Sequence, residues 1–323
     1  MDPSPAPKIS VVVPLCNERE NVVALWSELK TALDRTGEPW EAILVDDGST
    51  DGSQALLREA AAADARLRAL ILARNYGQTA ALAAGFEAAR ADVIVTLDGD
   101  LQNDPADIPT LLARIAEGHD VVCGWRRERQ DPFLTRVLPS RAANWLISWI
   151  TGVHLHDYGC TLKAYRREVL MDLHLYGEMH RFLPAIASWG GWRIAEAPVN
   201  HRPRQAGRSK YGLGRTLKVL LDLVTVKFLG SYVTKPIYVF GGLGIACFAL
   251  AFVSLGALVY RKVAGIESMI QSPLLLLSTL LVLLGAQSVF LGLLAEMLVR
   301  TYYESQKKHI YRVREVIGPP PPA

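Results

Sequence analysis

The chain has 323 residues, which is long enough for one large domain and an additional smaller segment. Its formal net charge of +3 is too small to indicate a nucleic-acid-binding protein. Hydrophobic residues make up 50% of the chain, a high fraction for a soluble enzyme, which predicts that part of it lies in lipid.

Residues 8–125 alternate between short apolar runs and helical patterns. The apolar runs predict five strands, at residues 9–15, 41–47, 67–73, 92–98 and 120–125. Helices are predicted to begin near Glu20, after the capping candidates at 49–51, at Thr79 and at Pro105. This alternation predicts an α/β fold whose mostly parallel, Rossmann-like sheet is covered on both faces.

Polar side chains follow three of the predicted strands, namely Asn17 and Glu18, Asp46 and Asp47, and Asp98 and Asp100. Ligands of such sheets bind at the carboxyl ends of the strands. An isolated D-x-D sequence is also typical of a solvated turn after a strand. Three acidic strand ends on one rim favour a binding site instead.

Asp98 and Asp100 are separated only by Gly99, and two carboxylates this close repel each other unless a cation or water screens them. Mg²⁺ or Mn²⁺ is typically held by one or two carboxylates together with substrate phosphates. Gln102 provides a third candidate ligand through its amide oxygen. The sequence therefore predicts a divalent cation that carries a diphosphate and stabilises it as a leaving group.

The last third of the chain has the composition of a membrane anchor. Residues 213–231 predict an amphipathic juxtamembrane helix, although an ordinary surface helix has the same pattern. Two charge-free stretches in residues 232–299 predict transmembrane helices at about 236–260 and 273–295, since about 20 residues cross a hydrocarbon core. Residues 300–323 are then a tail.

Basic residues indicate how this anchor is oriented. Lys and Arg are frequent between 215 and 235 and again between 300 and 314, which places both ends of the hairpin in the cytoplasm. The N-terminal ten residues are Pro-rich and lack the apolar stretch of a signal peptide. The four cysteines have no metal-ligand or C-x-x-C spacing and indicate free thiols in a reducing compartment. We therefore expect a multi-pass protein of the inner, cytoplasmic membrane, with residues 1–212 as its cytoplasmic catalytic domain.

Six segments resemble the family-2 glycosyltransferases of the GT-A fold. They are VVVPLCNE, ILVDDGSTD, LARNYGQTAALAAGF, DGDLQNDP, DYGCTLKAYRREVL and HRPRQAGRSKYG. The chain is most similar to the branch that transfers one sugar from a nucleotide donor to a polyprenyl phosphate. The resemblance covers nearly the whole chain, including the paired spans, and implies an inverting, metal-dependent transferase.

The resemblance also implies roles for single residues. It assigns the metal to Asp98, Asp100 and Gln102, and the lipid phosphate to Arg126, Arg136 and Ser140. It assigns the nucleotide sugar to Pro14, Leu15, Asn17, Glu18, Asp46, Asp47, Asn75, Gln78, Asp98, His180 and Arg181. Arg202, Arg204, Arg208 and Lys210 would close over the donor diphosphate or the acceptor phosphate, because guanidinium forks suit phosphate oxygens.

Asp157 occupies the position where an inverting transferase of this kind places its base, and with Asp100 it is the predicted catalytic residue. The second pKa of a phosphate monoester is about 6, so the acceptor is already largely deprotonated at neutral pH. Two roles for Asp157 therefore stay open: a base, or a group that orients the acceptor or the sugar. His154, His156 and His174 are interpreted as structural.

Three functions remain to be separated. The first is transfer of one sugar to a polyprenyl, or undecaprenyl, phosphate. The second is a processive polysaccharide synthase, which the absence of a Q-x-x-R-W sequence disfavours. The third is a membrane scaffold that binds sugar nucleotides without catalysis. The first implies a nucleotide-sugar donor, a lipid-phosphate acceptor, a possible homo-oligomer, and a downstream flippase and periplasmic transferase as partners. The donor sugar is left open.

Overall fold

The structure is a computed structural model that describes residues 6–127, 138–171, 179–203, 237–265, 272–305 and 311–318. Contacts divide the chain into two compact units, Met1–Val226 with His309–Ala323, and Lys227–Lys308. The expectations for Arg136, Arg204, Arg208, Lys210 and the 213–231 helix lie outside the described residues. Each unit is described by itself.

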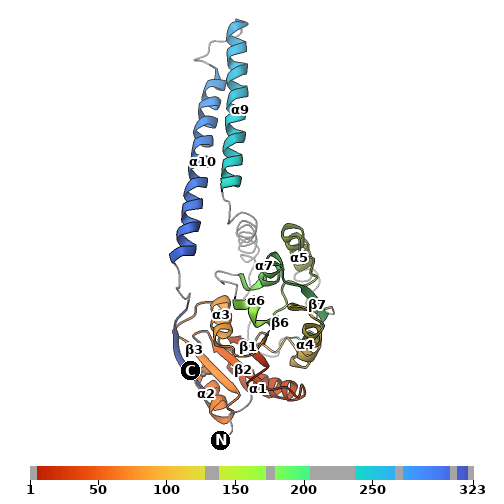
Figure 1. Cartoon of the computed structure of the whole chain (residues 1–323). Coiled ribbons are helices and arrows are strands. Elements are labelled where there is room, and N and C mark those ends of the chain that lie inside the picture. The colour runs from red at the N-terminus through yellow and green to blue at the C-terminus, as the bar shows by residue number, and fades with distance from the viewer. Residues whose placement is uncertain are drawn as a thin grey trace. The chain divides into compact units, whose positions relative to one another are not determined.

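An eight-stranded sheet forms the first unit (Figure 1), in the order β7-β5-β6-β4-β1-β2-β3-β8. The strands are β1 (Ile9–Leu15), β2 (Trp40–Asp46), β3 (Leu67–Leu72), β4 (Val93–Thr96), β5 (Val121–Trp125), β6 (Lys163–Arg166), β7 (Ile194–Pro198) and β8 (Val313–Ile317). The first four pair in parallel, as do β5 and β7, while β6 and β8 run antiparallel to their neighbours. The predicted, mostly parallel sheet is therefore confirmed for its central strands.

Helices cover both faces of this sheet. They are α1 (Arg19–Asp34), α2 (Ser53–Ala63), α3 (Gln78–Ala88), α4 (Ile108–Ala116), α5 (Leu138–Thr151), α6 (Arg167–Met171) and α7 (Leu183–Trp189), with short 3₁₀ turns η1 (Pro105–Asp107) and η3 (Met179–Arg181). Val11 and Val13 of β1 share one core with apolar residues of α1, α2 and α4. Val12 points to the opposite face, where it lies against Gly85 of α3.

Strand β8 is an element that the sequence analysis did not predict. Residues 300–323 were expected to be a tail, yet residues 313–317 pair antiparallel with β3 and extend the sheet. Arg58 of α2 forms an ion pair with Glu315 across this edge, and the Tyr311 hydroxyl donates to Glu87. The chain therefore returns to its first unit after the second unit is complete.

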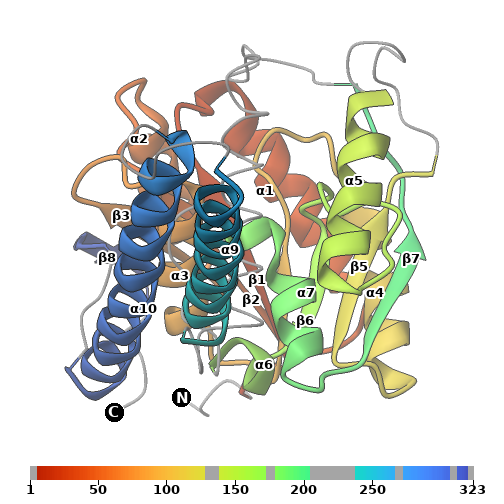
Figure 2. The same cartoon turned by 90° about the horizontal axis from the view of Figure 1, so that it is seen from above.

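The second unit is a pair of long apolar helices, α9 (Ile237–Val263) and α10 (Pro273–Ser305), which lie side by side in Figures 1 and 2. Residues 240–263 and 273–295 are long and apolar enough to cross a membrane. A Cβ atom on Gly244 would lie 2.9 Å from the Gly285 carbonyl oxygen, so small residues allow the helices to approach closely. Ser254 and Ser278 hydrogen-bond across the pair at 2.6 Å.

Candidate active site

A pocket of about 420 Å³ lies at the carboxyl ends of the central strands. It is lined by Pro14, Leu15, Cys16, Asn17, Glu18, Asp47, Asn75, Gly77, Gln78, Asp98, Gly99 and Asp100. These residues end or follow β1, β2, β3 and β4, four neighbouring parallel strands whose carboxyl ends meet at one edge of the sheet. The structure thus brings nine of the predicted donor and metal residues into one cavity.

The floor of the pocket explains why a glycine separates the two carboxylates. A Cβ atom on Gly99 would overlap the Cδ2 methyl of Leu15, which is buried across it. Two non-glycine residues near this floor have left-handed backbones, Asn17 with φ of 55° and Leu101 with φ of 59°. Such conformations are uncommon outside glycine and concentrate at functional sites.

One wall of the pocket is a loop held by Asp47. Its carboxylate accepts hydrogen bonds from the backbone nitrogens of Tyr76 (2.7 Å) and Gly77 (2.9 Å). Gly48, with φ of 69°, lets the chain pass against the backbone of Arg74 and Asn75, where a Cβ atom would clash. Asp47 therefore holds the loop that contains Asn75 and Gly77 at the side of the cavity.

Asp98 and Asp100 have the chemistry of a cation site. Burial, and after it the charge of Asp100, raises the pKa of Asp98 to about 6. Asp98 Oδ1 accepts a hydrogen bond from Gln78 Nε2 at 2.8 Å, and Asp100 Oδ1 accepts one from the Gln102 backbone nitrogen at 3.2 Å. A divalent cation would relieve the repulsion between the two carboxylates, so the residues present fit such an ion.

The ligand set is small. No group of three or more His, Cys, Asp or Glu side chains suited to a metal occurs among the residues that the structure describes. Gln102 is not among the pocket-lining residues, although its backbone lies beside Asp100. Two carboxylates leave most coordination positions to water and phosphate oxygens, as is usual for Mg²⁺ and similar ions.

Asp46, the last residue of β2, directly precedes the pocket-lining Asp47 and is fully buried. Its Oδ1 accepts from the Ser49 nitrogen (3.0 Å) and from Gln54 Nε2 (2.9 Å). Its Oδ2 is buried and has no hydrogen-bond partner within the described parts of the chain. An orphaned buried acceptor is costly, which makes Asp46 a candidate partner for a donor group on a ligand.

His180 and Arg181, predicted to contact the donor, do not line the pocket. The His180 ring is buried and lies 2.7 Å from the Thr79 hydroxyl, one residue after Gln78. Burial lowers its pKa to about 3, with Arg181 and Lys163 adding to the effect, so the ring is neutral. In this structure His180 supports the helix that carries Gln78.

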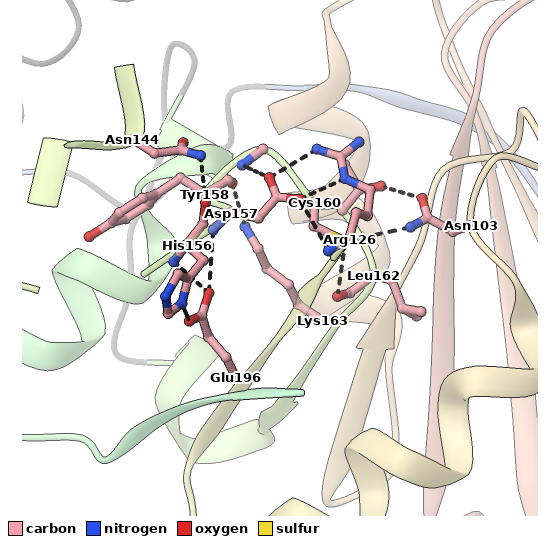
Figure 3. A network of polar contacts seen from close by, with 12 residues as sticks. Asn103, Arg126, Asn144, His156, Asp157, Tyr158, Cys160, Leu162, Lys163 and Glu196 are labelled. Carbon is pink, nitrogen blue, oxygen red and sulfur yellow. Dashed lines mark hydrogen bonds and ion pairs between the residues drawn. The ribbon is translucent and has the colours of Figure 1, made fainter. Parts of the chain in front are cut away.

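Asp157 and Arg126 form a second polar centre (Figure 3). Arg126 Nε lies 2.7 Å from Asp157 Oδ2, and Arg126 Nη2 lies 3.0 Å from Oδ1. The nitrogen of Gly159 also donates to Oδ1. The predicted base and the predicted phosphate ligand are thus joined in a buried, two-pronged ion pair, a relation that their sequence separation does not reveal.

Arg202 and Ser140 are the other predicted phosphate ligands that the structure describes. Arg202 forms ion pairs with Glu28 and Asp104, both at 2.7 Å. Its backbone nitrogen donates to the Gln102 carbonyl oxygen, which ties this segment to the D-x-D loop. Ser140 is half-buried in α5. Arg202 therefore holds the loop that follows the two carboxylates, a role not anticipated from sequence.

Comparison with known proteins identifies the family of this chain. Residues 10–173 match the Glycosyl transferase family 2 domain. The chain belongs to glycosyl transferase family 2. Among solved structures of the fold, glucosyl-3-phosphoglycerate synthase from Mycobacterium tuberculosis, in complex with Mn²⁺ and UDP-glucose, has a TM-score of 0.55 at 19% identity, over 69% of this chain and 79% of that chain.

Two family members are similar over almost their full length. Dodecaprenyl-phosphate galacturonate synthase of Rhizobium johnstonii is 42% identical over 98% of this chain and 94% of its own. Undecaprenyl-phosphate 4-deoxy-4-formamido-L-arabinose transferase of Shewanella sediminis is 39% identical over 96% of this chain and 92% of its own. The similarity therefore includes α9 and α10 as well as the family 2 domain.

Proposed function

We propose that this family 2 glycosyltransferase moves one sugar from a nucleotide donor to a polyprenyl phosphate, inverting the anomeric centre. The observation that carries the proposal is the pocket that holds Asp98 and Asp100 in a chain similar throughout to two polyprenyl-phosphate enzymes. The two membrane-length helices suit a lipid acceptor. The names of those relatives favour a uronic acid or a modified pentose as the sugar of the donor.

On the donor side, the residues divide by chemistry. Asp98 and Asp100 would hold Mg²⁺ or Mn²⁺, which supplies Lewis-acid stabilisation to the departing diphosphate. Asn75 and Gln78 provide side-chain amides at the N-terminus of α3. The buried Asp46 Oδ2 provides an unsatisfied acceptor for the nucleoside. Leu15 offers an apolar surface over Gly99.

On the acceptor side, we assign the phosphate to Arg126 with Ser140, and to Arg136 and the basic residues 204–210. Asp157 holds the guanidinium of Arg126 in one orientation. Because a phosphate monoester is mostly dianionic at neutral pH, its oxygen attacks without a strong base. Asp157 therefore acts by orienting Arg126 and the acceptor.

The connectivity of the sheet supports the proposed membrane topology. Strand β7 precedes the hairpin and β8 follows it, yet both belong to one sheet. This arrangement supports a topology in which both ends of the hairpin lie on one side of the bilayer, and the charge rule favours the cytoplasmic side. Trp145 and Trp149 of α5 are about 70% exposed, and with the exposed Arg141 they form a face suited to lipid headgroups. A product made there requires a flippase before any periplasmic transferase.

The experiment is turnover of a panel of nucleotide sugars with a short-chain polyprenyl phosphate in detergent. UDP-galacturonate, UDP-4-deoxy-4-formamido-L-arabinose, UDP-glucose and GDP-mannose are compared with and without EDTA. We expect a single lipid-linked sugar from one donor and no product in EDTA. A polymer would indicate a processive synthase, and donor binding without product would indicate a scaffold.

A further inference from the structure

Beyond these assignments, we infer that Glu196 is a positioning residue that sets the place of Asp157. Glu196 lies on β7, and it was not among the candidates from sequence. The inference rests on the proposed function only for the role of Asp157 in the reaction. The contacts of Glu196 are independent of that role.

The Glu196 side chain accepts hydrogen bonds from the backbone of the loop that contains Asp157. Its Oε1 accepts hydrogen bonds from the nitrogens of His156 (2.8 Å) and Asp157 (3.3 Å). Its Oε2 lies 2.7 Å from His156 Nδ1 (Figure 3). The carboxylate therefore binds two consecutive main-chain groups and one side chain of the same short loop.

The other polar groups of this loop are also held from outside it. Asn144 of α5 donates to the His156 carbonyl oxygen at 2.7 Å, and the buried Lys163 of β6 donates to the Tyr158 carbonyl oxygen at 3.3 Å. The His156 ring stacks on Trp125 with centroids 4.3 Å apart. Elements distant in sequence thus restrain three consecutive residues around one carboxylate.

The sheet places these groups together. Cys123 of β5 is in register with Lys163 of β6 on one side and with Glu196 of β7 on the other. Registered neighbours project to the same face, so Lys163 and Glu196 reach the loop from either side of Cys123. Arg126 follows the end of β5 and binds the Asp157 side chain. β5 and β7 therefore hold the same residue, one by its side chain and one by its backbone.

The low exposure of the Glu196 side chain supports the same role. The Glu196 side chain is 14% exposed, and a carboxylate with so little water is costly unless it is well paired. Within the parts of the chain that the structure describes, its hydrogen-bond partners lie in the Asp157 loop. A loop that only connects α5 to β6 does not need this number of restraints. A loop that must present one carboxylate and its arginine in a single orientation does.

The test begins with Glu196→Ala and Glu196→Gln in the full chain. Misplacement of Asp157 and Arg126 should lower kcat by about 10- to 100-fold in Glu196→Ala, with donor affinity unchanged. Glu196→Gln keeps an acceptor for the two backbone nitrogens and should retain most of the activity. Glu117→Ala is the matched control, since Glu117, which directly follows α4, is exposed and forms an ion pair with Arg114.

A double-mutant cycle with Asp157→Asn identifies the route of the effect. If Glu196 acts through Asp157, adding Glu196→Ala to Asp157→Asn should cost little more. Equal losses in both backgrounds would show that Glu196 acts elsewhere and would overturn the inference. If Glu196→Ala does not fold, Glu196→Asp, whose shorter side chain cannot reach both nitrogens, takes its place in the cycle.

Amide hydrogen exchange gives a readout that needs no substrate. Exchange in the peptide containing residues 153–160 should rise in Glu196→Ala and stay at the wild-type level in Glu117→Ala. Unchanged exchange would overturn the inference. If the wild type transfers no sugar to any lipid phosphate, the proposed function fails, and the exchange result still decides whether Glu196 holds the Asp157 loop.

Discussion

The two acidic centres of this protein lie in one unit and are built in opposite ways. Asp98 and Asp100 stand beside each other at a pocket floor, where burial and like charge raise the pKa of Asp98. Asp157 is instead joined to Arg126 by two hydrogen bonds, on a loop held by three other elements. Asp98 and Asp100 repel each other, so they suit the binding of a metal cation. Asp157 is already paired with the Arg126 guanidinium, so it suits the orientation of that side chain.

We expect the largest effect at Asp98 and Asp100, the repulsive pair of carboxylates. Asp100→Asn removes a charged ligand, and we expect turnover to fall by about 100- to 1,000-fold, the range for losing one electrostatic contact to a developing charge. Added Mn²⁺ should restore part of the loss because the affinity for the ion is reduced. The measurement is turnover against metal concentration. Full activity of the variant in EDTA would contradict the cation site.

Breaking the ion pair between Arg126 and Asp157, the paired centre, should lower the free energy of unfolding as well as the activity. Arg126→Ala leaves Asp157 buried without its cation, and breaking such a pair costs about 3–5 kcal/mol. The double variant Arg126→Ala/Asp157→Asn should recover most of this free energy of unfolding. Denaturant titration in detergent measures both. The exposed Arg127, changed to alanine, is the control, and equal instability of the single and double variants would show that the pair is not coupled.

His180 supplies a pH test on the donor side. Its pKa is lowered to about 3 in the folded protein, whereas an unfolded histidine titrates near 6.5. Between these values the unfolded chain binds the additional proton, so the free energy of unfolding should fall as the pH decreases from 6.5 towards 3. The slope from this residue is about 1.4 kcal/mol per pH unit. Wild type and His180→Gln, compared by denaturant titration, should differ in slope over this range and run parallel above pH 7. Parallel curves throughout would show that the ring is not buried in its neutral form.

The smallest effect concerns the spacing of the repulsive pair. Gly99→Ala places a methyl group against Leu15, and overpacking of this kind costs about 1–3 kcal/mol. Leu15→Ala in the same chain should relieve the clash. Thermal unfolding and the metal requirement are measured for both variants. If Gly99→Ala alone behaves as wild type, the tight contact between Leu15 and Gly99 does not set the spacing of the carboxylates.

Local patterns in the sequence were sufficient for the first half of the sheet and its pocket. Apolar residues dominate β1 to β5, and polar residues follow the strands closely, so short-range patterns predict that Asn17, Asp47 and Asp98 share one rim. The two membrane-length helices are equally local, because charge-free length alone identifies them.

The paired centre and the last strand depend on contacts that no local pattern encodes. Glu196 resembles any charged residue of an edge strand, and its function is visible only when β7 lies beside β5 and meets the loop before β6. Strand β8 is short and has two consecutive charged residues at its centre, and it becomes a strand because β3 offers an unpaired edge about 240 residues earlier in the chain. The sequence by itself determined which residues are ionisable and which segments are long and apolar enough to cross a membrane, since these follow from composition over short windows. Only the tertiary structure decided which charges meet, because pairing across a sheet depends on strand order and register.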